Sequence, residues 1–133
     1  ISAVRVPKDD GSRYCIVDAV KVENNVFQIK KLFEKPDIKE APSNMAAHGC
    51  YILTPDIFPI LGNLKPGKGG ELWLPDAIKE LMKKRPVYAC EIVNGKYYDT
   101  GNKLEYLKTV VEFALAHKDL NGEFRKYLKS LKL

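Results

Sequence analysis

The sequence predicts an α/β fold, in which a mixed β-sheet with flanking helices is followed by two C-terminal helices. Runs rich in Val, Ile, Tyr and Phe, which are typical of strands, are bounded by turn residues. Stretches with apolar residues at helical spacing lie between the later strands and close the chain. A length of 133 residues is enough for one packed domain. We expect residues 1–102 to form the α/β part and residues 103–133 a helical segment.

The first predicted elements are strands. Residues 1–6 alternate apolar and polar side chains, so the chain begins inside a strand, as a piece cut from a longer protein would. The unpaired edge of such a strand and the apolar faces of the C-terminal helices would favour self-association, so a homo-oligomer is expected. Residues 14–20 and 26–33 form a predicted hairpin around the turn residues between them. A mostly apolar run over residues 45–53 predicts a buried central strand.

Helices and one more hairpin complete the prediction. Thr-Pro-Asp at residues 54–56 is typical of the start of a short helix. The glycine-rich residues 65–70 form an expected flexible loop that leads into a helix over residues 75–82. A strand over residues 87–93 is followed by Asn-Gly, which predicts a hairpin with residues 96–98 returning. Two amphipathic helices end the chain, and Asp119 or Asn121 is expected to cap the second.

Composition excludes several classes of protein. The net charge is +5, but the lysines are spread out without interleaved aromatic residues, so no nucleic-acid partner is predicted. No apolar run approaches the roughly 20 residues of a membrane helix, so no membrane partner is predicted. Three distant cysteines fit neither a zinc site nor a disulfide framework, and reduced thiols in the cytoplasm are the expected state.

Charged residues next to turn residues are the candidates for chemistry. Glu34 and Lys35 end a predicted strand, where a carboxylate can accept hydrogen bonds from sugar hydroxyls and an ammonium can neutralise a phosphate. The alternative is an ordinary exposed strand end. Asp99 precedes a glycine turn, where it either caps the turn or supplies one carboxylate to Mg²⁺. The glycine loop lacks the Gly-Lys-Ser/Thr ending of a triphosphate loop. His48 and His117 are each isolated from other ligand-type residues, which favours structural roles.

An ordered set of short motifs resembles the second half of the bacterial UTP-glucose-1-phosphate uridylyltransferases, nearly from end to end. The motifs are Phe33-Glu34-Lys35-Pro36, Gly49-Cys50-Tyr51-Ile52-Leu53-Thr54-Pro55-Asp56, Gly69-Gly70-Glu71 with Asp76-Ala77-Ile78, and Tyr97-Tyr98-Asp99-Thr100-Gly101-Asn102. The resemblance implies a Rossmann-like nucleotidyltransferase fold. It also implies transfer of a uridylyl group from UTP to glucose 1-phosphate, which gives UDP-glucose and pyrophosphate with Mg²⁺ bridging the phosphates.

The resemblance also implies roles for individual residues. Glu34 would contact the glucose hydroxyls, Lys35 the sugar phosphate and Asp99 the metal, so Lys35 and Asp99 are the expected catalytic residues. The backbone from Ala47 to Gly49 and the ring of Tyr51 would line the sugar pocket. Residues 1–102 would then be the sugar-phosphate-binding part of a nucleotidyltransferase domain.

Departures from the family pattern limit these expectations. The family commonly has glycine at the position of Cys15 and a basic residue at that of Cys50, while Trp73 and Pro75 replace smaller or polar residues. The Gly-x-Gly-Thr-Arg loop that holds UTP, its lysine and a second metal-binding aspartate do not occur in residues 1–133. We therefore expect the chain alone to be inactive. Two alternatives remain open, namely a fragment of a transferase that uses dTTP or CTP and a non-catalytic oligomerisation module.

Overall fold

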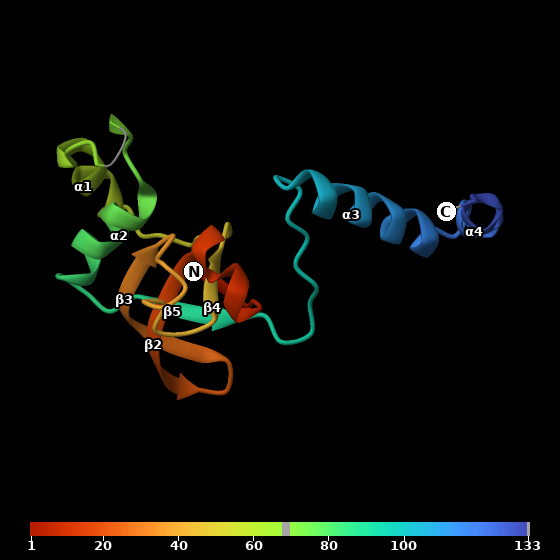
Figure 1. Ribbon diagram of the computed structural model, residues 1–133. Helices are drawn as coiled ribbons and strands as arrows, with labels where there is room; N and C mark the ends of the chain where they lie inside the picture. The colour runs from red at the N-terminus through yellow and green to blue at the C-terminus, as the bar shows by residue number, and fades with distance from the viewer. Residues whose placement is uncertain (68–69, 133) are drawn as a thin grey trace. The chain divides into compact units, whose positions relative to one another are not determined.

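The computed structural model describes residues 1–67 and 70–132, which form two compact units, Ile1–Gly95 and Lys96–Leu133 (Figure 1). Each unit is described by itself. The predicted glycine loop includes Lys68 and Gly69, which lie outside the described residues. The functional division expected between residues 102 and 103 stays a prediction.

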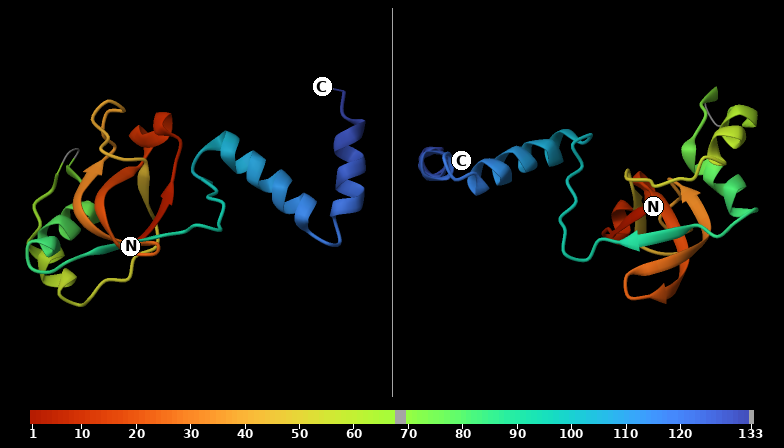
Figure 2. Two further views of the ribbon diagram at one scale, coloured as in Figure 1. Left: turned by 90° about the horizontal axis from the view of Figure 1, so that it is seen from below. Right: turned by 180° about the vertical axis from the view of Figure 1, so that it is seen from behind.

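A closed five-stranded sheet is the centre of the first unit, counted over its described residues (Figure 2). The strands are β1 (Ser2–Arg5), β2 (Cys15–Glu23), β3 (Val26–Glu34), β4 (Met45–His48) and β5 (Tyr88–Glu91), and a 3₁₀ helix, η1 (Lys8–Arg13), joins β1 to β2. Their order around the barrel is β1-β4-β2-β3-β5. Only the β1–β5 pair is parallel among the described pairs. The predicted mixed sheet and the β2–β3 hairpin are confirmed.

Pairing between β1 and β5 closes the barrel. Ser2 lies opposite Cys90 and Ala3 opposite Glu91, and the amino group of Ile1 donates a hydrogen bond to the Tyr88 carbonyl at 2.9 Å. The Arg5 guanidinium and the Glu91 carboxylate join the same two strands at 2.9 Å. On its other side β1 pairs with β4, so the unpaired edge expected at the start of the chain is wrong.

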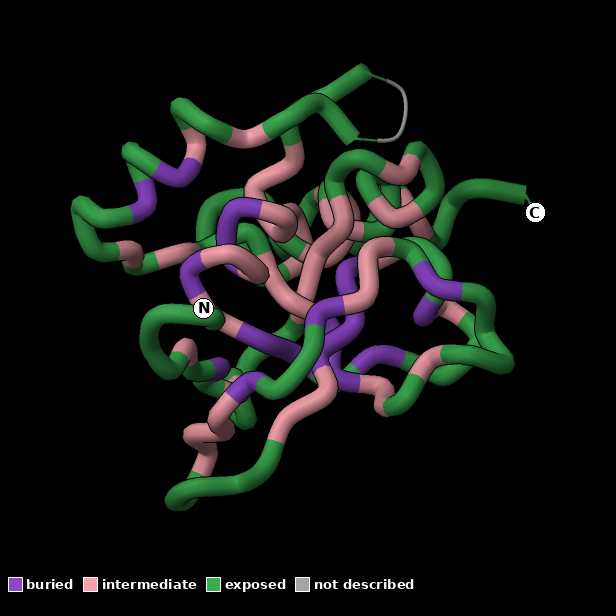
Figure 3. Tube along the Cα trace, turned by 90° about the vertical axis from the view of Figure 1, so that its left-hand side faces the viewer, coloured by how far each residue is buried: buried purple, intermediate pink, exposed green. Residues whose placement is uncertain are grey.

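Two helices cover part of the barrel. These are α1 (Ile57–Asn63) and α2 (Leu74–Met82), which pack against each other, and α2 also packs on β3. The prediction of a helix over 75–82 is confirmed, with its Ala77, Ile78 and Leu81 side chains buried. They join a core built mainly from the strands, and the buried stretches of the trace are shown in Figure 3. Burial of this apolar face is the main force that holds α2 in place.

Three of the predicted features differ from the structure. Strand β4 ends at His48 rather than at 53, because the Cys50 N–H turns back to bond the His48 carbonyl at 2.6 Å. Helix α1 begins at Ile57 rather than within residues 54–56, and its N-cap residue Asp56 makes no side-chain cap bond. Residues 96–98 form no strand. The predicted return hairpin is wrong because β1 and β3 already occupy both edges of β5.

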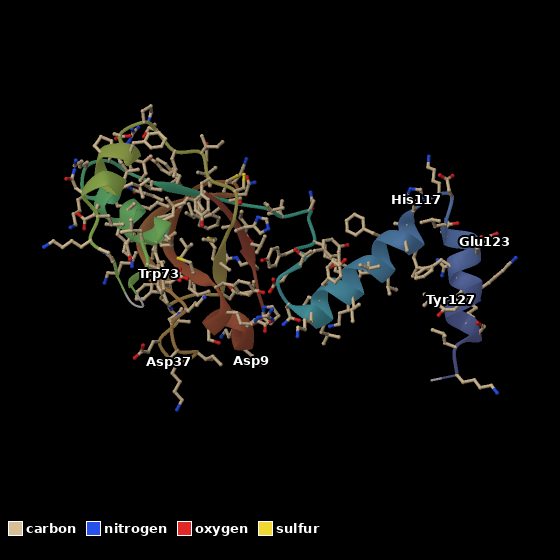
Figure 4. The ribbon with its side chains drawn as sticks, turned by 90° about the horizontal axis from the view of Figure 1, so that it is seen from above. Asp9, Asp37, Trp73, His117, Glu123 and Tyr127 are labelled. Carbon is tan, nitrogen blue, oxygen red and sulfur yellow. The ribbon has the colours of Figure 1, made fainter. Side chains whose placement is uncertain are left out.

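The second unit contains α3 (Lys103–Ala116) and α4 (Asn121–Ser130), as predicted (Figure 4). The Asn102 carboxamide oxygen caps α3 by accepting hydrogen bonds from the N–H groups of Leu104 at 3.0 Å and Glu105 at 3.1 Å. Residue 120 is the N-cap of α4 and forms no side-chain cap bond, so the caps predicted at Asp119 or Asn121 are wrong. Instead, the Asp119 N–H donates to His117 Nδ1 at 3.3 Å.

The helices of the second unit have no buried residues, although apolar side chains repeat along α3. Leu104, Leu107 and Phe113 are each at least 60% exposed. Self-association through such a face stays a prediction. Within residues 1–67 and 70–132, no helix combines the length and the apolar character needed to cross a membrane.

Candidate functional site

A row of residues across neighbouring strands positions Glu34. Cys15 of β2 lies opposite Glu34 of β3, and Ile16 lies opposite Ala46 of β4. One step along that antiparallel register brings Cys15 beside Ala47, which itself pairs with Ala3 of β1. Residues aligned across a sheet point to the same face. Three small side chains, those of Ala3, Cys15 and Ala47, therefore lie in one row with the Glu34 carboxylate.

Glu34 contacts the thiol of Cys15. The pKa of Cys15 is raised to about 12, mainly by burial and also by the negative charge of Glu34 and a side-chain hydrogen bond to Glu34. A thiol with such a pKa is protonated at neutral pH, so the S–H is the donor and the carboxylate is the acceptor. Cys15 is buried and Glu34 is half-buried. The S–H of the buried Cys15 thus orients one oxygen of the Glu34 carboxylate.

Tyr51 belongs to the same cluster. Burial raises the pKa of its phenol, and electrostatic interactions with Cys15 and Glu34 act in the same direction. The ring is half-buried and packs against the core. Glu34 and Tyr51, which the sequence assigned to one sugar pocket, are therefore brought together.

A charged pair on α2 faces the same cluster. Lys79 Nζ lies 2.9 Å from Asp76 Oδ1 and donates a hydrogen bond to it. Both charges act on the Cys15 thiol, where Lys79 lowers the pKa and Asp76 raises it. Sequence reasoning did not assign these two residues to the site. Their spacing of three on a predicted helix placed them on one face, but which strand that face covers depends on the tertiary packing.

Lys35 has a backbone conformation that side chains rarely adopt. Its φ is +45°, the only positive φ of a non-glycine residue among those described, and its N–H donates to the Tyr14 carbonyl at 3.1 Å. A residue before proline favours extended backbone, so Pro36 makes this conformation still less favourable. Such conformations persist where the surrounding structure enforces them, and they cluster at functional sites. The side chain of Lys35 is exposed directly beside Glu34.

Ala47 and Gly49 lie at the end of β4. Ala47 is half-buried and Gly49 is exposed. A Cβ built on Gly49 would meet no atom within 4 Å. The backbone at this point is therefore open to a ligand, which fits the predicted role of this segment.

Asp99 belongs to the second unit and is described there. Its Oδ1 accepts a hydrogen bond from the Gly101 N–H at 3.2 Å, two residues before the start of α3. The Asx turn that the sequence left open as one role for Asp99 is thus present. No group of three or more His, Cys, Asp or Glu residues in the described part of the chain could hold a metal ion by itself.

Accessibility separates the three cysteines. Cys15 is buried, whereas Cys50 and Cys90 are exposed. Because the thiolate is the reactive form, a pKa of about 12 for Cys15 makes its reactive fraction at pH 8 roughly a thousandfold smaller than that of an ordinary thiol. We expect iodoacetamide to alkylate Cys50 and Cys90 at least about 100-fold faster than Cys15.

Peptide mass spectrometry after timed alkylation measures this difference. In denaturant all three cysteines should react at similar rates, which provides the control. Labelling of Cys15 as fast as Cys50 in the folded protein would contradict the contact with Glu34.

A family model described as nucleotidyl transferase matches residues 1–114. The chain belongs to the nucleotidyl transferase family. Curated relatives within this family include UTP–glucose-1-phosphate uridylyltransferases from Staphylococcus haemolyticus, 40% identical over 131 residues, and from Staphylococcus epidermidis, 37% identical over 131 residues. Each alignment covers 98% of this chain and 45% of the relative. The chain thus spans less than half the length of these relatives.

Solved structures confirm the nucleotidyltransferase fold. A UTP-bound UGPase from Acinetobacter baumannii is 34% identical, with a TM-score of 0.85 over 99% of this chain and 45% of that one. A UDP-glucose pyrophosphorylase complexed with UDP-glucose is 35% identical, with a TM-score of 0.83 over 88% of this chain and 44% of the other. The predicted resemblance is therefore confirmed at the level of both sequence and fold.

Proposed function

We propose that residues 1–133 form the sugar-phosphate-binding part of an enzyme that transfers a uridylyl group from UTP to glucose 1-phosphate. The observation that supports this most directly is the end of β3, where the half-buried Glu34 carboxylate precedes Lys35 in its unusual backbone conformation. The names of the relatives supply the substrates, because they specify UTP, glucose 1-phosphate and UDP-glucose.

Each residue has a role that suits its surroundings. Glu34 would accept hydrogen bonds from glucose hydroxyls with the oxygen that Cys15 leaves available. Lys35, exposed at the turn, would neutralise the sugar phosphate as a point charge. The ring of Tyr51 and the open backbone from Ala47 to Gly49 would line the sugar pocket.

The reaction needs positioning more than a protein nucleophile. A phosphate oxygen of glucose 1-phosphate attacks the α-phosphorus of UTP, a new P–O bond forms, and pyrophosphate leaves with the electrons of the broken P–O bond. The contribution of Lys35 is to hold the attacking phosphate and to offset its charge as it approaches a second anion. Residues 1–133 contain no Gly-x-Gly-Thr-Arg loop, so UTP would be held by a segment outside them.

We further propose that Asp99 supplies one carboxylate to Mg²⁺. The donor set fits this role, because Mg²⁺ usually takes one or two protein carboxylates and completes its coordination with water and substrate phosphates. Asp99 is half-buried at a glycine turn that fixes one of its oxygens. When bound, the ion would neutralise charge on the phosphates.

Pairing the chain with a nucleotide-holding segment tests this function. The part of the Staphylococcus haemolyticus relative that the chain does not match would be expressed separately and mixed with residues 1–133. We expect formation of UDP-glucose from UTP and glucose 1-phosphate, measured by chromatography, because the two pieces together carry both halves of the site. The matched control is the same segment without residues 1–133.

A second pairing tests whether the chain belongs to a transferase that uses UTP or to one that uses dTTP or CTP. The corresponding segment of a glucose-1-phosphate thymidylyltransferase should give no product with residues 1–133 and dTTP, because its contact surface belongs to another group of enzymes. Product from this pair and none from the uridylyl pair would overturn the uridylyl assignment.

A further inference from the structure

A cavity of about 720 Å³ lies between β3 and the C-terminal end of α2, and neither Glu34 nor Lys35 lines it. Six basic side chains line it: Lys30, Lys31, Lys79, Lys83, Lys84 and Arg85. Apart from Gln28, the rest of the lining is apolar and includes Ile29, Leu32 and Met82, and no acidic residue of the described chain lines the cavity. We refer to this site as the basic cavity. Its volume is in the range of cavities that hold small molecules.

A β-bulge brings two consecutive lysines into the basic cavity. Asp18 of β2 lies opposite Lys31, and the next residue, Ala19, lies opposite Ile29, so Lys30 is an extra residue in β3. In a regular strand, neighbouring side chains point to opposite faces. The bulge suspends this alternation, and both lysines line the same cavity. Bulges of this kind re-aim side chains beside functional sites.

Three of the six charges have acidic partners. Lys79 pairs with Asp76 at 2.9 Å, Lys83 with Glu80 at 2.7 Å, and Arg85 with Asp56 at 3.5 Å.

The other three charges lack such partners. Lys30 donates to the neutral Gln28 side chain at 2.8 Å. Neither Lys31 nor Lys84 forms an ion pair with a described residue. Cations after α2 offset the negative end of its dipole, but this does not account for the lysines on the strand opposite. Three uncompensated positive charges around one cavity repel one another, and an anion would relieve that repulsion.

We propose that the basic cavity binds an anion that carries two or more phosphate groups. Lysines bind phosphates as point charges, and charges on two sides of the cavity match a chain of phosphates better than a single one. The apolar lining can take a non-polar moiety attached to that chain. This site is distinct from Glu34 and Lys35, so the proposal goes beyond the uridylyl transfer proposed above.

Calorimetric titration of residues 1–133 with inorganic triphosphate and with ATP tests the proposal. Lys31→Ala combined with Lys84→Ala removes two uncompensated charges and should weaken binding of the probe at least about tenfold, since hydrogen bonds to charged groups are strong. The matched control, Lys21→Ala combined with Lys39→Ala, removes the same charge from exposed positions outside the cavity. It should change the dissociation constant less than about twofold.

Lys35→Ala separates this site from the sugar-phosphate site and should leave binding of the probe unchanged. Tighter binding of ATP than of triphosphate would assign the apolar lining to a nucleotide, and equal binding would assign the site to the phosphate chain alone. Circular dichroism confirms that each variant is folded. Equal affinity of the Lys31/Lys84 double variant and the unmodified chain, or no binding of either probe, would overturn the proposal.

Discussion

Residues 1–133 alone should form UDP-glucose more than about a thousandfold more slowly than the same chain paired with a segment that holds UTP. Holding two reactants in line lowers a barrier by about 7 to 11 kcal/mol, and loss of about 4 kcal/mol of that already slows turnover a thousandfold. Lys35 can still meet the sugar phosphate, but nothing in residues 1–133 resembles the loop that would align the triphosphate with it.

The measurement is pyrophosphate release from UTP and glucose 1-phosphate with Mg²⁺. Binding of glucose 1-phosphate by the chain alone, measured by calorimetry, would show that the sugar-phosphate part is folded. Slow turnover would then be due to the missing segment and not to misfolding. Rapid turnover by the chain alone would mean that UTP binds within residues 1–133, and the proposed division of the site would be wrong.

Replacement of Lys35 by alanine in the paired enzyme should reduce kcat/KM by about 30-fold to 1,000-fold, equivalent to about 2 to 4 kcal/mol of lost transition-state stabilisation. The Michaelis constant for glucose 1-phosphate should rise more than that for UTP, because the ammonium is assigned to the sugar phosphate. Steady-state kinetics with each substrate varied in turn measures the difference. An equal rise for both substrates would move the phosphate contact elsewhere.

Two further variants separate the charge of Lys35 from its backbone. Glycine adopts a φ of +45° without strain, so Lys35→Gly should be more stable than Lys35→Ala by about 1 kcal/mol, yet equally impaired in kcat/KM. Lys39→Ala, which removes an exposed lysine from the following loop, is the control and should retain normal kinetics. Recovery of activity in Lys35→Gly would show that the backbone, not the ammonium, matters.

Local signals in the sequence predicted most of the elements. Asn24 and Asn25 marked the hairpin, and apolar spacing marked α2, α3 and α4. The signal of Asn94-Gly95 was equally strong, but it predicted a strand that does not form. A turn dipeptide specifies only local geometry, whereas a hairpin also needs a free strand edge, and both edges of β5 are already paired. Closure of the barrel depends on contacts between distant residues, which periodicity does not reveal.

The candidate site could likewise be predicted only in part from local signals. Glu34, Lys35 and Tyr51 could be proposed because their motifs match a known family, whereas the strand pattern alone fitted an ordinary exposed strand end equally well. The contact between Cys15 and Glu34 depends on the register of β2 against β3, which the hairpin fixes. Asp76 and Lys79 reach this contact only through the packing of α2 on the sheet.

Pairing of β1 with β5 also has a consequence for the order of folding. The hydrogen bond from Ile1 to Tyr88 joins residues 87 positions apart in the chain, and this strand pair has only two matched positions. Contacts of such long range form late, because closing the long loop between them costs conformational entropy before the contacts stabilise the fold. During synthesis, β1 would leave the ribosome before β5 and could pair with it only after the residues between them had been made. The β2–β3 hairpin, whose strands are adjacent in sequence, can form in that interval and provide the surface on which the barrel closes.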